Sequence, residues 1–316
     1  MLADSKTMGK QKVRNRKVQT FIKFIPVYLM ALPGLAYLFI NNYMPLPGLV
    51  LAFKKYSAKK GIYGSDWVGF KNFKFLFGSD GWIITRNTLL YNFVFIALGT
   101  TCAIAVAIIL SEMTGKFKNV LQSVLILPHM ISSVITSYLV YGFLAPDTGF
   151  VNKTILPLFG AEPIEWYLEK KYWPFIIVIV SLWRSVGYNC IVYLSTIMGF
   201  DRAFYEAATI DGAGKLQQIF KITLPLLKPT IIMLAMMSIG RIFYSDFGLF
   251  YQVPMNQGTL FPVTQTIDTY VYRGLIQLGN VALSAAAGFY QSMVGFVLVL
   301  SSNLLVRKLD RDSALF

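Results

Sequence analysis

The sequence predicts an all-α, polytopic membrane protein with six transmembrane helices. Of its 316 residues, 55% are hydrophobic and only 14% are charged, against about 25% charged in an average soluble domain. A spanning helix needs about 20 predominantly apolar residues, and six stretches reach roughly that length. They are Pro26 to Met44, Thr88 to Leu110, Val120 to Leu144, Trp173 to Met198, Leu224 to Phe247 and Val281 to Val306.

The first stretch is expected to be a retained span, because it is too long for the apolar region of a signal peptide and no cleavage site of small residues follows it. Residues 1–25 are basic, so the positive-inside rule places them in the cytoplasm as a tail. Their charged residues are Lys6, Lys10, Lys12, Arg14, Arg16, Lys17 and Lys23 against Asp4. Six spans within a transmembrane domain of residues 26–306 then return the carboxyl tail, residues 307–316, to the cytoplasm.

The segments between the spans alternate between the two sides. Glu112 to Asn119 and about 199–223 face the cytoplasm on this topology, and both contain basic residues. The segment of about 45–87 faces outside although it is rich in lysine, because the charges of long loops have less weight in the rule. Its aromatic residues are interspersed with lysines, so we expect an external amphipathic segment at the headgroup level. The loops Ala145 to Tyr172 and Gly248 to Asn280 are expected to form the outer surface.

The composition argues against several kinds of chemistry. The net charge is +14, but membrane orientation explains most of it, and no soluble basic domain for nucleic acid is visible. Cys102 and Cys190 both fall within predicted spans and are too few for a disulfide framework or a metal cluster. The single histidine, His129, has no cysteine or carboxylate ligand nearby in sequence, so we predict no metal site. The pattern G-x-x-x-x-G-K-[ST] is absent, so a partner must hydrolyse any ATP.

One cytoplasmic loop carries the most specific pattern of the chain. Glu206-Ala-Ala-Thr-Ile-Asp-Gly212 is followed after nine residues by Ile222-Thr-Leu224-Pro225. Ala207 and Ala208 favour a helix of little bulk, nearby carboxylates are stabilised at helix starts, and Gly212 permits a tight reversal. These properties predict a short helix that docks on another protein. An amphipathic loop without a partner is the alternative.

The spacing of this loop resembles the cytoplasmic motif in the membrane subunits of bacterial ABC importers, and every fixed position of that motif is matched. The resemblance implies the type I ABC importer permease fold, in which the loop inserts into a cleft of an ATPase subunit and transmits its closure to the spans. It implies that Glu206 contacts a basic residue of the ATPase. ATP and Mg²⁺ would then be bound by the partner ATPase, no cofactor is expected in this chain, and the chain would be a transport subunit rather than an enzyme. The implied ATPase-coupling residues are Glu206, Ala207, Ala208, Asp211, Gly212 and Ala213.

Further segments resemble the carbohydrate-uptake permeases of the polysaccharide and complex-oligosaccharide branch. They are Tyr43-Met-Pro45-Leu-Pro47-Gly48, Ala52-Phe53-Lys54-Lys55-Tyr56, Trp67-Val-Gly69-Phe70-Lys-Asn72-Phe73 and Leu127-Pro128-His129-Met-Ile-Ser132. The resemblance implies a subunit of the bacterial cytoplasmic membrane that works with a second permease, two ATPase subunits and an external binding protein to import an oligosaccharide. Two alternatives stay open. One is an ABC permease for a non-sugar solute, and the other is a membrane enzyme acting on a lipid or glycan, for which no acid-base or metal constellation is visible.

Candidate cargo contacts are polar residues at predicted membrane depth, because ionisable groups inside spans usually face a water-filled interior. Arg184 and Tyr188 share a face of the fourth span, and Arg241 and Tyr244 share one of the fifth. We predict that these four residues border one cavity near the middle of the bilayer, where arginine favours an acidic cargo. The alternative is an ion pair between arginine and Asp246 that ties the two spans together. The predicted path residues are Arg184, Tyr188, Asn189, Arg241, Tyr244, Asp246 and Gln291.

Overall fold

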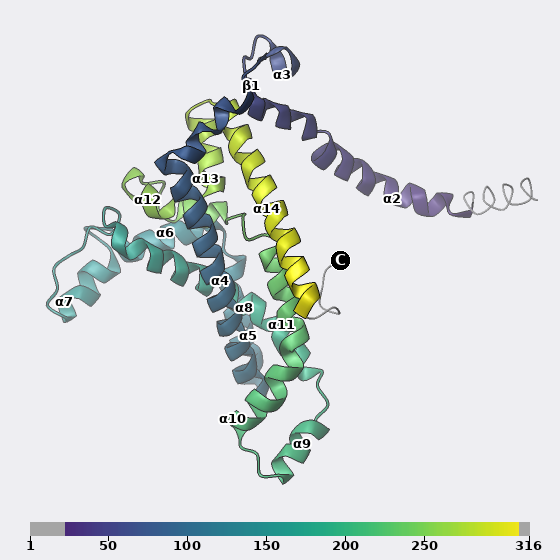
Figure 1. Ribbon diagram of the computed structural model, residues 1–316. Helices are drawn as coiled ribbons and strands as arrows, with labels where there is room; N and C mark the ends of the chain where they lie inside the picture. Colours follow the sequence, from purple (N-terminus) through teal and green to yellow (C-terminus); the bar gives the residue numbers. More distant parts are fainter. Residues whose placement is uncertain (1–22, 310–316) are drawn as a thin grey trace, which may run out of the picture.

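The structure, a computed structural model, describes residues 23–309 and is built almost entirely from helices (Figure 1). Residues 1–22 and 310–316 lie outside the described residues, and with them most of the two expected tails. Five helical stretches in the described part are long and apolar enough to cross a membrane, and a bent pair of helices adds a sixth. The expected all-α class is confirmed. The five stretches are Ile25–Phe53, Ser79–Glu112, Lys170–Met198, Lys215–Ile239 and Val281–Lys308.

The first span begins with a helix, α2 (Ile25–Leu38), that projects away from the other helices (Figure 1). The π-helical turn η1 (Phe39–Tyr43) and the 3-10 helix η2 (Leu46–Phe53) complete the span. No residue of α2 is buried within this chain. An exposed face that is apolar on all sides is suited to lipid or to another membrane helix.

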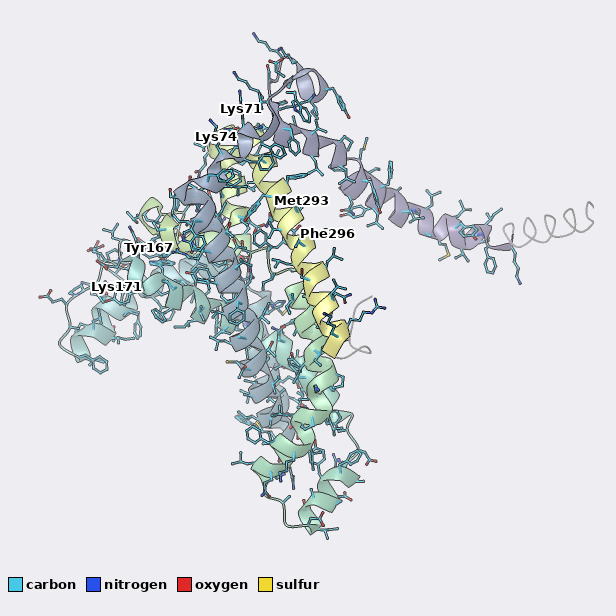
Figure 2. The ribbon with its side chains drawn as sticks, in the orientation of Figure 1. Lys71, Lys74, Tyr167, Lys171, Met293 and Phe296 are labelled. Atoms are coloured by element: carbon cyan, nitrogen blue, oxygen red, sulfur yellow. The ribbon has the colours of Figure 1, made fainter. Side chains whose placement is uncertain are left out.

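The segment that the sequence analysis expects outside the membrane folds into a small hairpin and a 3-10 helix at one end of the molecule. Strand β1 (Lys54–Lys55) pairs in antiparallel fashion with β2 (Asp66–Trp67), and α3 (Gly61–Gly64) lies between them. Helix η3 (Gly69–Phe77) follows, and its Lys71 and Lys74 lie at this end of the molecule (Figure 2). The Lys60 ammonium, which hydrogen-bonds Asp66, lowers the pKa of that carboxyl.

A pair of long helices forms the centre of the bundle. Helix α4 (Ser79–Glu112) packs along α8 (Trp173–Met198). At 1.5 Å per residue, the 34 residues of α4 extend about 50 Å, which exceeds the roughly 30 Å hydrocarbon core. Helix α5 (Lys116–Met130) also packs against α8, so closely that a Cβ at Gly187 would overlap the carbonyl of Leu125.

The predicted third span is not one continuous helix. Helix α5 ends at Met130 and α6 (Ser133–Leu144) follows with a bend of 100° between them. Pro128 removes a backbone donor in the last turn of α5, and the Ser132 Oγ caps α6 by accepting from the Ile135 amide at 3.3 Å. The expected helix over Val120 to Leu144 is therefore two helices joined at a corner.

The predicted fifth span also ends early. The short helix α10 (Lys215–Gln218) and the π-helical turn η6 (Ile219–Thr223) lead into α11 (Leu224–Ile239). From Gly240 the chain leaves the helix, and it resumes helical form only at η7 (Gly248–Gln252). The prediction that the helix runs to Phe247 is wrong for residues 240–247. Arg241 and Tyr244 therefore do not share a helix face.

The segment after η7 was expected at the outer surface, but much of it is buried among the helices. It contains η8 (Gly258–Leu260), α12 (Phe261–Thr264), α13 (Ile267–Tyr272) and η9 (Arg273–Gln277). Polar residues of α4 bind its backbone: Tyr91 donates to the Val263 carbonyl at 2.7 Å, and Thr88 accepts from the Ile267 amide at 3.1 Å. This explains why the otherwise apolar helix α4 carries polar side chains at these positions.

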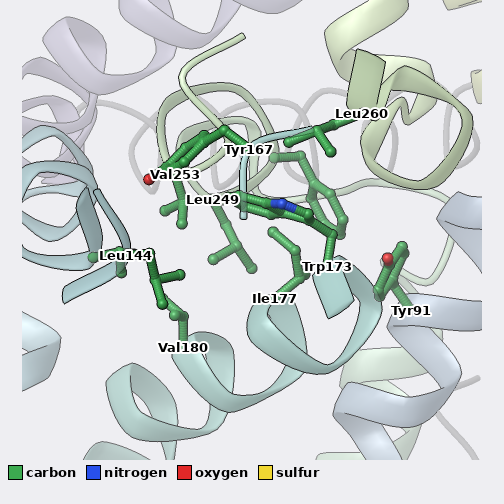
Figure 3. Packing of buried hydrophobic residues seen from close by; sticks show 11 residues of the cluster. Tyr91, Leu144, Tyr167, Trp173, Ile177, Val180, Leu249, Val253 and Leu260 are labelled. Atoms are coloured by element: carbon green, nitrogen blue, oxygen red, sulfur yellow. The ribbon is translucent and has the colours of Figure 1, made fainter. Parts of the chain in front are cut away.

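The last helix, α14 (Val281–Leu309), begins near the hairpin and packs against α13 and η2. Its Met293 and Phe296 are exposed and point outward (Figure 2). The largest buried apolar cluster lies at the start of α8, where Trp173 and Ile177 meet Leu249 and Phe250 (Figure 3). The preceding loop contributes Tyr167 to this cluster and contains η4 (Val151–Ile155), α7 (Leu156–Leu158) and η5 (Lys170–Tyr172).

Candidate functional site

Two features could carry function, and the first is the motif loop, defined as residues 199–223. It lies at the end of the molecule opposite the hairpin (Figure 1). Glu206, Ala207 and Ala208 lie on the short helix α9 (Ala203–Ile210), which is the docking helix that the sequence predicts. The Asp201 carboxylate accepts from the Ala203 amide at 2.9 Å at the start of this helix. Glu206 itself is exposed in the first turn, where the helix dipole favours a negative charge.

The turn after α9 depends on Gly212. Its φ is +79°, a left-handed conformation that side chains rarely adopt. Asp211 ends α9, and the Ala213 amide bonds back to the Ala208 carbonyl at 2.8 Å. The expected role of Gly212 as the reversal point agrees with this geometry.

Internal hydrogen bonds hold the motif loop in one shape. Gln218 donates to the Thr209 hydroxyl at 3.0 Å and to the Ala213 carbonyl at 3.1 Å, and the hydroxyls of Tyr205 and Thr223 lie 3.1 Å apart. These bonds join α9 to the start of the fifth span.

The motif loop also exposes large apolar side chains that sequence reasoning did not single out. Ile210 is 87% exposed and Leu216 is 71% exposed, and Phe204 and Phe220 are exposed as well. Apolar side chains gathered on one loop indicate a protein interface. Behind the loop lies a cavity of about 1130 Å³, which Glu112, Lys116 and Arg202 help to line. Lys215 bonds to Glu112 at 2.6 Å across its mouth, so the loop is also tied to the end of α4.

The second feature is the central cavity, of about 560 Å³. It lies between α4, α8 and residues 240–247 after α11, which are called the unwound segment. Four of the predicted path residues line it, namely Asn189, Arg241, Tyr244 and Asp246. The remaining lining residues are Asn92, Phe95, Ile96, Thr100, Ser181, Ser185, Ser238 and Ser245. Hydroxyl, amide and aromatic groups therefore surround a space that is large enough for a sugar unit.

Arg184 forms an ion pair with Asp246 beside the cavity. Its Nη1 lies 3.2 Å from the Asp246 carboxylate, and the side chains are 18% and 52% exposed. The second oxygen of Asp246 accepts from the Leu249 amide, in the first turn of η7, at 3.1 Å. The ion pair expected as the alternative is therefore present for Arg184, and it joins α8 to the unwound segment.

Arg241 differs from Arg184 in having no partner. Its side chain is exposed and lines the cavity, and it forms no hydrogen bond or ion pair with any residue that the structure describes. Tyr244 lies beside it in the same lining. The cavity therefore contains one guanidinium that is free to bind a ligand.

Two predicted path residues lie elsewhere. Tyr188 stacks on His129 with the ring centres 4.3 Å apart, and it does not line the cavity. Gln291 is buried, and its amide donates to the Phe243 carbonyl at 2.9 Å and to Asp268 at 3.1 Å. Only Arg241 and Tyr244 of the four residues predicted to border one cavity line it.

The lining residues that the sequence analysis missed show a spacing that could have found them. On α4 they include Asn92, Ile96 and Thr100, and on α8 they are Ser181 and Ser185, which continue at the same spacing to the predicted Asn189. Residues four apart share a helix face. Small polar residues recurring at this spacing in an apolar helix indicate a face turned toward water.

Comparisons with known proteins identify the family of the chain. Residues 99–311 match the family described as binding-protein-dependent transport system inner membrane component. The chain is 33% identical to the polygalacturonan/rhamnogalacturonan transport system permease protein YteP of Bacillus subtilis, covering 96% of this chain and 94% of the relative. It is also 33% identical to protein LplB of the same organism, over 90% of each chain.

Solved structures give the same result. A chain of a bacterial ABC transporter involved in the import of the acidic polysaccharide alginate has a TM-score of 0.84 and 31% identity, covering 93% of this chain and 99% of that one. A chain of a bacterial alginate ABC transporter in complex with an alginate pentasaccharide-bound periplasmic protein has a TM-score of 0.82 and 31% identity, covering 92% of this chain and 97% of that one. The chain therefore belongs to the inner-membrane components of binding-protein-dependent transport systems, as the membrane-spanning permease subunit of an ABC importer.

Proposed function

We propose that this permease forms half of a translocation path for an acidic oligosaccharide. The observation that carries the proposal is the unpaired guanidinium of Arg241 in the central cavity, next to Tyr244. A guanidinium binds a carboxylate through charge-assisted hydrogen bonds, and an aromatic ring suits the apolar face of a sugar. The import of polygalacturonan by one relative and of alginate by a solved relative supports an acidic cargo.

In this proposal the path is completed by three kinds of partner. A second permease encloses the other side of the cavity, an external binding protein delivers the cargo, and two ATPase subunits bind ATP and Mg²⁺. Docking on an ATPase is assigned to α9, where Glu206 faces a basic residue among the exposed apolar side chains of the motif loop. Ala207 and Ala208 keep the helix narrow, while Asp211, Gly212 and Ala213 form the turn that presents it.

The proposed orientation places both termini in the cytoplasm. The motif loop and the hairpin lie at opposite ends of the bundle (Figure 1), as a cytoplasmic loop and an external segment must. The basic residues before the first span support the cytoplasmic position of the amino end. On this orientation the central cavity lies between the two ends.

The experiment begins with the affinity-tagged chain purified from its native membranes under mild conditions. An ATPase, a second permease and a binding protein should co-purify and be identified by mass spectrometry. In proteoliposomes, the complex should hydrolyse ATP faster when the binding protein carries trigalacturonate. A neutral trisaccharide that stimulates equally well would refute the acidic cargo, and the absence of an ATPase would refute the assembly.

A further inference from the structure

The unwound segment, defined as residues 240–247, places backbone amides and carbonyls at membrane depth without helical partners. Each such group costs free energy unless it is hydrogen-bonded, because no bulk water is present in the bilayer core. The few backbone bonds that the segment makes within itself are of the turn type, such as that from the Tyr244 amide to the Arg241 carbonyl at 2.9 Å. The other groups must find partners on neighbouring elements.

Side chains from three other helices supply those partners. Asn92 of α4 donates to the carbonyls of Ile242 and Tyr244, at 3.0 Å each. Gln291 of α14 donates to the Phe243 carbonyl at 2.9 Å, and Asp268 of α13 accepts from the Ser245 amide at 2.7 Å. Four consecutive backbone positions are thus held from outside the segment.

Asp268 joins these contacts into one network. The oxygen that accepts from the Ser245 amide also accepts from the Ser245 hydroxyl at 2.6 Å, and its other oxygen accepts from the Gln291 amide at 3.1 Å. No lysine or arginine in the described part of the chain forms an ion pair with it. The carboxylate is satisfied by hydrogen-bond donors, and its position fixes that of Ser245.

The segment held in this way provides much of one wall of the central cavity. Arg241, Tyr244, Ser245 and Asp246 all line the cavity, whereas Asp268 and Gln291 do not. A movement of Ser245 would therefore move the groups that face the cargo on either side of it. Hydrogen bonds to a charged group are stronger than neutral ones, so the carboxylate is the strongest of the three anchors.

We propose that Asp268 is a positioning residue for cargo binding. It holds the unwound segment in the shape that presents Arg241 and Tyr244 to the cargo, without touching the cargo itself. This inference rests on the proposed role of the central cavity as the cargo path. Asp268 lies in the segment Gly248 to Asn280, which the sequence analysis expected at the outer surface.

The test compares Asp268→Asn with Asp80→Asn in the purified complex. Both replace a carboxylate by an amide of the same size, but Asp80 is an exposed residue in the first turn of α4, away from the cavity lining. Two quantities are measured: the equilibrium binding of radiolabelled trigalacturonate, and the amide hydrogen exchange of residues 240–247 without cargo. Asp268→Asn should weaken binding and speed exchange by about tenfold each, because a hydrogen bond to a charged group is lost. Asp80→Asn should change neither quantity.

A second variant, Gln291→Met, removes the amide that joins Asp268 to the Phe243 carbonyl while keeping a side chain of similar length. It should act in the same direction as Asp268→Asn, and the double variant should be less than additive, because both residues belong to one network. A positioning role predicts weaker cargo binding in a complex that melts near the wild-type temperature, whereas a purely structural role predicts a lower melting temperature. Asp268→Glu, which keeps the charged acceptor, should bind cargo better than Asp268→Asn.

Three outcomes decide the proposal. Weaker cargo binding and faster exchange in complexes that melt near the wild-type temperature support it. Wild-type binding in folded Asp268→Asn and Gln291→Met complexes overturns it, as does a loss that lowered abundance fully explains. If the wild-type complex binds neither trigalacturonate nor a neutral trisaccharide, the proposed cargo is wrong. The hydrogen-exchange measurement needs no cargo, so unchanged exchange of residues 240–247 in Asp268→Asn and Gln291→Met still overturns the anchoring role of Asp268.

Discussion

The same substitution at two glycines of the motif loop should have opposite consequences. Gly212 has a φ of +79°, whereas Gly214 has an extended backbone with φ −69° and ψ 165°. A Cβ at either position would meet nothing within 4 Å. Serine at these positions therefore differs only in the backbone conformation that it must adopt.

The magnitude follows from this difference. An L-residue in the left-handed region costs roughly 1–2 kcal/mol, so Gly212→Ser should lower the population of the docking shape by a factor of about 5 to 30. Gly214 precedes α10 at its N-cap, where serine is preferred. Gly214→Ser should leave the loop as stable as before or slightly more stable.

The assay is the affinity of the purified ATPase for the permease in detergent or nanodiscs. The Gly212→Ser complex should bind the ATPase about 5 to 30 times more weakly, because the docking shape is populated less. Gly214→Ser should bind like wild type. Equal losses in the two variants, or no loss in either, would refute the role of the left-handed turn.

Three further predictions concern topology, charge and packing. In a background without Cys102 and Cys190, a cysteine at Asp147 should react with an impermeant thiol reagent added outside intact cells and one at Lys215 should not; reaction at both would contradict the orientation. Arg241→Gln should reduce uptake of trigalacturonate while the abundance of the permease stays normal. Arg184→Gln should reduce uptake and also lower the melting temperature, because it removes the partner of Asp246 at a cost of about 1 kcal/mol. Unchanged uptake in both variants would exclude the cavity as a path for an acidic cargo. Gly187→Ala should destabilise the purified complex by about 1–3 kcal/mol or more through overlap with the Leu125 carbonyl, and a melting temperature equal to that of wild type would show that α5 and α8 are not so closely packed.

Local signals predict the elements that local physics determines. The fourth span begins with Trp173 and ends with Met198, as expected, because Pro174 suits the first turn of a helix and Gly199 follows its end. The docking helix and the reversal at Gly212 also follow from residues within the loop itself. These features need no information from distant parts of the chain.

The unwound segment could not be predicted in this way. The sequence from Gly240 to Phe247 contains no proline that would end a helix, and the partners that hold its backbone, Asn92, Asp268 and Gln291, lie far away in sequence. Because α11 ends at Ile239, Arg241 and Tyr244 do not lie on the helix face that the sequence analysis assumed for them. The bend in the third span is different, since Pro128 and the capping Ser132 are local signals that could have predicted it.

The most direct test of the coupling role is ATP hydrolysis by the reconstituted complex that carries Glu206→Arg. Glu206 is exposed on α9, so the variant should fold and insert normally. Reversing its charge should weaken docking by about 2–5 kcal/mol or more, because the basic partner loses its ion pair and is repelled. Stimulation of ATP hydrolysis by the loaded binding protein should disappear, and uptake should disappear with it, at normal abundance of the permease. Wild-type stimulation and wild-type uptake in this variant would contradict the assignment of the motif loop as the ATPase-coupling element.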